Sequence, residues 1–232
     1  MHKVLVLLLL ASLQCTLGGT HLQYKVTSMR LNVASIDMKL VDPEINIAVK
    51  SRIKIPLFPH LDNHYKIIHD EDYRPVQYTR LVQQSGLKDS VYTVYQKSSA
   101  RMYQKLTGNS NTYAVRADTR DVFSLLAKIS SDPNAGGEYT VDGNGRLWLV
   151  TVSKGRTEKI STALGKQSAR RHDFRFKALS PDKAPYIDML TFNFLDNDTK
   201  LSLWVSMNGI PLKADLRKNL TSMSWDILSV SE

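Results

Sequence analysis

Apolar and polar residues alternate along much of the chain. From Ile45 to Ile55 the odd positions are mostly isoleucine or valine, and the even positions include Lys50, Arg52 and Lys54. Side chains on a β-strand point to opposite faces in turn, so this pattern predicts a strand with one apolar and one basic face. A helix would scatter the same isoleucines around its circumference. The same alternation returns at 36–40, 174–177 and 201–207.

Further strands are predicted where β-branched and aromatic residues are frequent. They are Tyr24–Leu31, Val76–Gln83, Ser90–Gln96, Arg101–Leu106, Arg146–Ser153, Arg156–Ala163, Leu212–Lys218 and Met223–Leu228. Turn residues separate them at 108–109, 142–145, 154–155, 196–198 and 208–209. The pair Asn208-Gly209 predicts a tight hairpin, because both residues tolerate the positive φ that such a turn needs.

One segment has helical spacing instead. Val122, Leu125, Leu126 and Ile129 share one face of a helix predicted from Asp121 to Ser131. Thr119 or Asp121 can cap its start, and Asp132-Pro133 ends it. A second helical or irregular stretch is expected at Phe58–His69. The sum predicts a mainly β protein, with a single highly curved antiparallel sheet or an open or half barrel and one or two short helices.

The first 18 residues have the pattern of a secretory signal peptide. A basic start at Lys3 precedes a continuous apolar run from Val4 to Ala11, and small residues follow at Thr16 and Gly18. Cleavage after Gly18 would leave one β-rich domain at 19–232, exported to the periplasm or the outer envelope. An uncleaved N-terminal anchor and lipidation of Cys15 are the alternatives.

Composition narrows the protein class. The chain has 232 residues, of which 42% are hydrophobic and 23% charged, and this mixture excludes a wholly disordered chain, a collagen-like fibre and a multi-span membrane protein. A single Cys excludes an intramolecular disulfide framework.

Lys and Arg exceed Asp and Glu by 31 to 22, which gives a net charge of +9. Lys50, Arg52 and Lys54 share one predicted strand face, and Arg175 and Lys177 share another. An exported protein with such faces suits anionic lipid head groups or an anionic envelope glycolipid, although a basic face can also serve solubility alone. No element has aromatic residues interleaved with these cations in a nucleic-acid-binding pattern, so nucleic acid is not an expected partner.

The sequence carries no strong catalytic, cofactor or metal motif. His60, Asp62 and His64 would share a face if they lay on a strand, but Pro56 and Pro59 nearby favour a polar loop over a zinc site. There is no nucleophile elbow of the Gly-x-Ser-x-Gly type. We therefore predict no catalytic residue, no cofactor and no metal, and an uncharacterised hydrolase ranks third among the function hypotheses.

The apolar strand faces give the main functional hypothesis. If the sheet curls, its inner face carries Ile45, Ile47, Val49, Ile53, Phe174, Phe176, Leu201 and Leu203. These side chains either fill a core or line a cavity that accepts a lipid or lipid-linked group. The first hypothesis is thus a non-enzymatic envelope protein that binds a hydrophobic or amphipathic ligand. The second is a structural module that pairs with another envelope protein through exposed strand edges.

The order of elements resembles a family of exported bacterial proteins known as domain of unknown function 3108. The resemblance rests on the early strand at Tyr24–Leu31 and on loose motifs at 70–75 (DEDYRP), 121–126 (DVFSLL), 162–165 (TALG) and 204–211 (WVS to Pro211). The family's Arg after the helix and the Gly that follows it are hard to place here. The resemblance implies an exported, mostly antiparallel β fold, similar in outline to the half-barrels that carry lipoproteins or lipids between envelope membranes, and it implies no catalytic residues.

Overall fold

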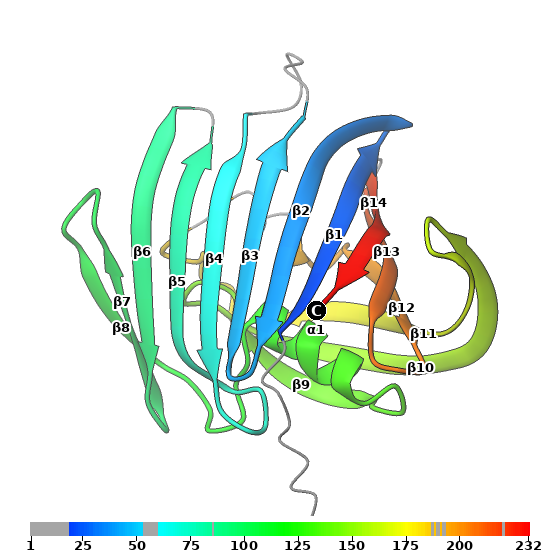
Figure 1. Ribbon diagram of the computed structural model, residues 1–232. Helices are drawn as coiled ribbons and strands as arrows, with labels where there is room; N and C mark the ends of the chain where they lie inside the picture. The colour runs from blue at the N-terminus through cyan, green and yellow to red at the C-terminus, as the bar shows by residue number, and fades with distance from the viewer. Residues whose placement is uncertain are drawn as a thin grey trace, which may run out of the picture.

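A large curved antiparallel sheet forms the body of the protein (Figure 1). The computed structural model describes residues 19–52, 60–84, 86–186, 188, 191, 194–219 and 221–232. The signal segment predicted at 1–18 lies outside these residues. Within the described residues, no helix is both long and apolar enough to cross a membrane.

The sheet has 14 strands, and the described residues include the α-helix α1. The first eight strands are β1 (Thr20–Ser28), β2 (Leu31–Val41), β3 (Glu44–Ser51), β4 (Asp62–His69), β5 (Pro75–Gln84), β6 (Leu87–Tyr95), β7 (Ser99–Gln104) and β8 (Ser110–Ala114). After α1 (Val122–Ser131) come β9 (Gly137–Asp142), β10 (Leu147–Thr162), β11 (Gly165–Ala178), β12 (Lys200–Ser206), β13 (Pro211–Lys218) and β14 (Thr221–Ser231).

Two meanders meet in the middle of the sheet. The order is β8-β7-β6-β5-β4-β3-β2-β1-β14-β13-β12-β11-β10-β9, so neighbouring strands within each half are consecutive in sequence. The central pair joins the two ends of the described chain, with His21 opposite Ser231. The strands β8 and β9 are the two edges, and the sheet is not closed into a barrel between them.

The alternating pattern decides which face of each strand is buried. In β3, Ile45, Ile47 and Val49 are buried while Lys50 is exposed. The apolar side chains of one face must leave water, and the sheet curves around them. The prediction of a mainly β fold with a single highly curved antiparallel sheet is therefore confirmed. The hairpin at Asn208-Gly209 is also present, between β12 and β13.

Two local predictions are wrong. Asp62–His69 is the strand β4 rather than a helical or irregular stretch. It pairs with β3 and β5, and its inward positions include the polar residues Asn63 and His69. The turn expected at Lys154-Gly155 is also absent, because β10 runs through it as one long strand. Its register with β11 shifts between Lys154 and Thr157, which is the signature of a β-bulge.

Helix α1 lies on the concave side of the sheet, on the segment that crosses from the β8 edge to the β9 edge (Figure 1). Asp121 caps it by accepting hydrogen bonds from the backbone N–H of Phe123 at 2.8 Å and of Ser124 at 3.1 Å. Its buried residues include Phe123, Leu125 and Ile129. The helix thus fills part of the space that the curved sheet would otherwise leave open.

The main packed core lies between α1 and the second meander. Leu125 and Ile129 of the helix belong to one cluster with Val150, Phe174 and Leu201 from the facing strands. Phe123 points to the first meander instead, where its ring lies 5.3 Å from that of Tyr65. The helix therefore separates a filled side of the sheet from a side that is less completely filled.

Candidate functional site

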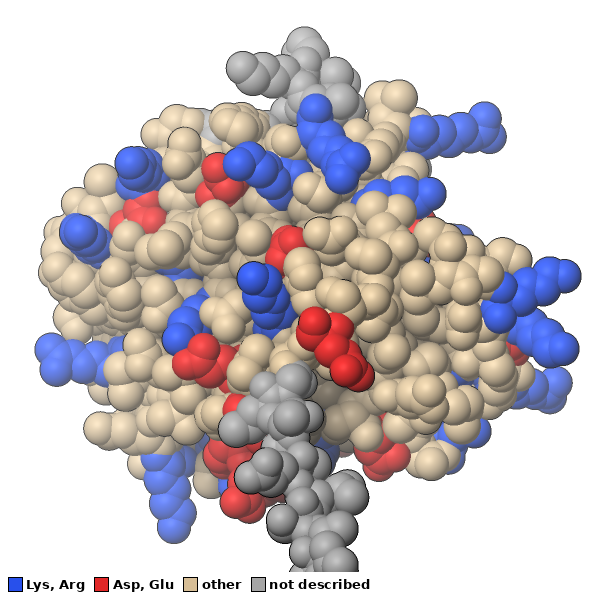
Figure 2. All heavy atoms as spheres, in the orientation of Figure 1, with Lys and Arg blue, Asp and Glu red and all other residues tan. Residues whose placement is uncertain are grey.

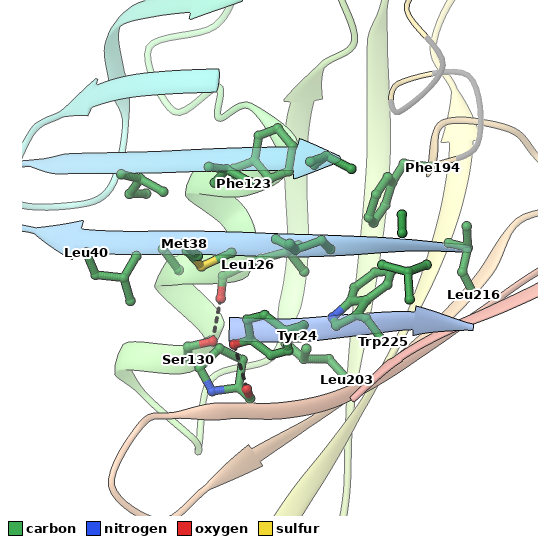
Figure 3. A pocket seen from close by; sticks show the side chains of 18 of the residues that line it. Tyr24, Met38, Leu40, Phe123, Leu126, Ser130, Phe194, Leu203, Leu216 and Trp225 are labelled. Atoms are coloured by element: carbon green, nitrogen blue, oxygen red, sulfur yellow. Dashed lines mark hydrogen bonds between the residues drawn. The ribbon is translucent and has the colours of Figure 1, made fainter. Parts of the chain in front are cut away.

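An apolar cavity of about 560 Å³ lies between the concave face of the first meander and helix α1. Its walls come from β1–β4 on one side and from α1, β13 and β14 on the other. Figure 3 shows side chains from these elements, from β12 and from the segment before β12 converging on the space: Tyr24, Met38, Leu40, Phe123, Leu126, Ser130, Phe194, Leu203, Leu216 and Trp225.

Strand alternation builds the wall on the sheet side. Ile36, Met38 and Leu40 are alternate residues of β2, and Ile45 and Ile47 are alternate residues of β3. Each set points to the same face because side chains on a strand change face at every residue. The wall is consequently continuous and apolar across neighbouring strands.

The helix supplies the facing wall with Leu126 and Ala127. Both are half-buried, whereas Leu125 and Ile129 on the other side of the helix are fully packed in the core. Ala127 is small, so the helix leaves room beside it that a larger residue would occupy.

The polar groups in the middle of the cavity are satisfied within the protein. The Tyr24 hydroxyl donates to the Pro211 carbonyl at 2.8 Å, and the Ser130 hydroxyl donates to the Leu126 carbonyl at 2.8 Å (Figure 3). Because both hydroxyls already donate to backbone oxygens, the wall presents mainly hydrocarbon to an occupant.

Titratable residues line one end of the cavity. Asp42 and His69 are 3.9 Å apart at their nearest side-chain atoms, and the His69 ring stacks on Tyr73 with 4.7 Å between centroids. The Nδ1 atom of His69 lies 2.8 Å from the Asp70 carbonyl oxygen, which fits an N–H donor there.

A hydrolytic triad needs a serine held by such a histidine. Ser28 lines the cavity at the far end of β1 and donates to the Ser222 carbonyl at 3.1 Å. Two serines of α1, Ser130 and Ser131, also line the cavity, but their hydroxyls donate to the Leu126 and Lys128 carbonyls of the helix. None of these serines is presented to His69 as an activated nucleophile.

The structure separates the predicted lining residues into two groups. Ile45, Ile47, Val49 and Leu203 line the cavity. Phe174, Phe176 and Leu201 belong to the packed core between α1 and the second meander. Ile53 lies outside the described residues.

Several wall residues were not part of the sequence-based set. Phe123, Leu126 and Ala127 come from α1, and Trp225 comes from β14. The helical spacing of residues 122–129 marks one apolar face, but it gives no sign that a second side of the same helix faces the sheet. The alternation at 36–40 was a usable signal for the β2 wall.

The predicted basic residues fall on two separate strands. Lys50 and Arg52 are exposed at the upper end of β3, and Arg175 and Lys177 are exposed on β11. Lys54 lies outside the described residues. Five strands of the sheet order (β2, β1, β14, β13 and β12) lie between β3 and β11, so the two groups do not form one basic face.

The histidine-rich segment does not gather metal ligands. Asp62 and His64 are neighbours on the outer face of β4, with 3.4 Å between their nearest side-chain atoms, and Asp62 also pairs with Lys50 at 3.5 Å. His60 is exposed just before this strand. Within the described ranges, no group of three or more His, Cys, Asp or Glu side chains could hold a metal ion.

A second cluster of titratable groups connects strands β6 and β8 with the edge strand β9. The Tyr95 and Tyr113 hydroxyls donate to one oxygen of Asp142, at 2.7 and 2.8 Å, and the Gly145 N–H donates to the other at 2.7 Å. Burial raises the pKa of Asp142, while these hydrogen bonds and the buried Arg80 oppose the rise. All three donors are held by the fold, so this cluster has a structural role in joining β6 and β8 to the end of β9.

Comparison with solved structures shows the fold. The chain is similar to a β-barrel-like protein of domain of unknown function DUF1849 from Brucella abortus, with a TM-score of 0.64, 10% identity, and coverage of 93% of this chain and 98% of that one. At that identity the likeness shows the architecture alone.

Two more distant structures were also found. A candidate lipoprotein from Parabacteroides distasonis has a TM-score of 0.38 at 9% identity, covering 92% of this chain and 95% of that one. A candidate exported protein with a YmcC-like fold from Bacteroides fragilis has a TM-score of 0.34 at 8% identity, covering 92% and 96%.

No protein-family model matches the chain, and no curated protein matches its sequence. The resemblance to domain of unknown function 3108 is therefore not confirmed and stays a prediction.

Proposed function

We propose that this chain is an exported cell-envelope protein that binds a hydrophobic or amphipathic ligand, of the lipid class, between the concave sheet face and α1. Binding rather than catalysis is its role. The observation that carries the proposal is the apolar cavity of about 560 Å³. Small-molecule sites in proteins typically measure about 300–1,000 Å³ and are mostly apolar, with few polar groups.

Burial of the cavity walls supports an occupant. Apolar surface removed from water contributes about 25 cal/mol per Å², and the walls are mainly apolar side chains of the strands and α1. A ligand that fills the space with hydrocarbon gains this burial on its own surface and on the walls.

The chemistry of the walls indicates the class of ligand. Apolar residues from β2, β3 and α1 form both sides, and the carboxylate and imidazole groups of the lining lie at the end near Asp42 and His69. An elongated hydrocarbon chain with one polar end matches this distribution, because the chain contacts the walls while the polar end stays near water.

Native mass spectrometry of the protein purified without detergent from its own envelope tests the proposal. We expect an added mass that lipid extraction removes and identifies. A clean apo mass, together with no uptake of a fluorescent fatty acid by the purified protein, would refute the proposal. If crosslinking in cells then captured one protein partner without lipid, the structural-module hypothesis would replace it.

A further inference from the structure

The turn between β1 and β2 has residues that its backbone does not favour. Ser28 pairs with Leu31, so Met29 and Arg30 form a two-residue hairpin loop. Both have positive φ, at 49° and 67°. Tight hairpins with positive φ at both central residues strongly prefer Asn-Gly, because an ordinary side chain is strained there. Strain of this kind points to a function for the residues that bear it.

The same turn exposes apolar surface at an end of the cavity. Met29 is 73% exposed and Leu31 is 49% exposed, and both line the cavity. Leu106, in the β7–β8 turn at the same end of the sheet, is 60% exposed. The apolar lining thus continues from the interior on to the outer surface at this end of the sheet. We call the end that carries Met29, Leu31 and Leu106 the Met29 end.

The Met29 end is basic. The turns that follow β1, β3, β5 and β7 all lie there, and they carry Arg30, Arg52 and Lys105. Among the described residues of these four turns there is no Asp or Glu. In the orientation of Figure 2, Lys and Arg side chains stand along the upper edge of the molecule, where these turns lie.

The opposite end is more acidic. The turns that follow β2, β4 and β6 carry Asp42, Asp70, Glu71 and Asp72, against the cations Arg74 and Lys97. Strand β2 connects the two ends with 11 residues, so at about 3.3 Å per residue they are more than about 30 Å apart.

Exposed apolar side chains occur at the opposite end as well, for example Val41 and Val76. Apolar exposure alone therefore does not distinguish the two ends. Charge does: an anionic surface attracts the Met29 end and repels the other, and this difference orients the molecule.

We infer that the Met29 end is a docking surface for an anionic phospholipid bilayer, with Met29 and Leu31 entering the head-group layer and Arg30 and Arg52 contacting lipid phosphates. The mouth of the cavity then faces the membrane, and a lipid-class ligand passes between the bilayer and the protein there. The transfer of a ligand between bilayer and protein rests on the proposed function, whereas docking of the protein on the bilayer is measured separately.

A double substitution tests docking without weakening the fold. In Met29→Asn/Arg30→Gly, the turn gains the residue pair that its backbone prefers, so we expect a higher unfolding midpoint in urea. The matched control is Met207→Asn/Lys97→Gln, which also removes one exposed methionine and one cation. Met207 is 53% exposed in the β12–β13 turn, and Lys97 is exposed in the β6–β7 turn.

The measurement is co-sedimentation with vesicles of phosphatidylcholine and phosphatidylglycerol in equal parts, beside vesicles of phosphatidylcholine alone. We expect the wild type to bind the anionic vesicles more tightly and to lose binding as salt rises. The loss of one interfacial cation and one apolar side chain should lower the partition of the Met29→Asn/Arg30→Gly variant by roughly tenfold or more. The control variant should bind as the wild type does.

Two results would overturn the docking proposal: a wild type that does not bind the anionic vesicles, or equal binding by the turn variant and the control. Uptake of a fluorescent fatty acid in solution without vesicles is measured on the same proteins. If the wild type takes up none, the ligand-binding proposal fails, and the vesicle measurement still decides whether the Met29 end docks.

Discussion

Filling the cavity from the helix side is the sharpest test of a ligand site. Ala127 faces the cavity from α1, and Ala127→Trp places an indole in the space that an acyl chain would use. We expect the variant to lose uptake of a fluorescent fatty acid while it keeps its fold. The proposal depends on real space beside this residue, so the effect on stability is as informative as the effect on binding.

The expected stability change can be estimated. A Trp side chain buries about 150–250 Å², and at about 25 cal/mol per Å² this gives about 4–6 kcal/mol if it is fully enclosed. Strain from the added atoms costs about 1–3 kcal/mol, and an indole N–H without a partner costs about 1–3 kcal/mol. The sum lies between a loss of about 2 kcal/mol and a gain of about 4 kcal/mol in the free energy of unfolding. In a filled core the indole would gain no such burial, and Ala→Trp would lower the free energy of unfolding by more than this.

Fluorescence titration and urea unfolding measure the two effects. Ala117→Trp is the matched control, because it makes the same change at an exposed turn residue and should leave both quantities as in the wild type. Fatty-acid affinity equal to that of the wild type would refute the reasoning. So would a loss of stability of more than about 2 kcal/mol, since it would show that the site beside Ala127 is already filled.

Three further changes test how the fold is held together. His172 is fully buried with no hydrogen-bond partner for either ring nitrogen, and burial, with Arg170 nearby, lowers its pKa. The folded state therefore holds His172 neutral, and stability should fall as pH drops below about 6.5, where the unfolded chain takes up the proton. His172→Leu should show a smaller fall in the urea midpoint between pH 8 and about pH 5. A fall equal to that of the wild type would contradict this. Asp121→Ala removes the acceptor for two helix N–H groups and should lower the free energy of unfolding in urea by about 0.5–2 kcal/mol. Asp121→Asn keeps an acceptor oxygen and should lower it less. Equal losses in the two variants would argue against the capping role. Gly209→Ala should lower the thermal unfolding midpoint for two reasons. Gly209 has a φ of 81°, and an added Cβ would lie 2.9 Å from the Ser130 carbonyl oxygen. A midpoint at or above that of the wild type would show that the turn relaxes.

Strand alternation made most of the sheet predictable. The stretch from Ile45 to Ser51 became β3 with its apolar residues inward, because period-two burial is a local property that sequence displays directly. Strand β4 was missed for a physical reason. Two of its inward positions are polar: Asn63 donates to the Tyr65 hydroxyl at 3.0 Å, and His69 is satisfied by a backbone oxygen. Asn63 also accepts a hydrogen bond from the Gln83 N–H of β5 at 2.9 Å. Such hydrogen bonds make polar positions compatible with burial, and the alternation of apolar and polar residues does not show them.

The candidate site was predictable on one wall. Ile45, Ile47 and Val49 line the cavity as strand residues of a curved sheet. The packing of α1 decided where the remaining apolar residues lie: it covers Phe174 with Leu125 and Ile129, and it leaves space beside Ala127. Which part of a concave face a helix covers depends on the path of the chain between the sheet edges, and periodicity within the helix carries no information about that path.

The position of the central strand pair has a consequence for assembly. Each meander needs only neighbouring segments to form, but β1 and β14 come from opposite ends of the described chain, with Leu22 opposite Val230. Contacts so far apart in sequence form slowly, since a long loop must close before they are gained. Removing the segment from Thr221 onward would not trim an edge. It would cut the sheet into two halves, each with a newly bared strand, β1 on one and β13 on the other, open to pairing with other molecules.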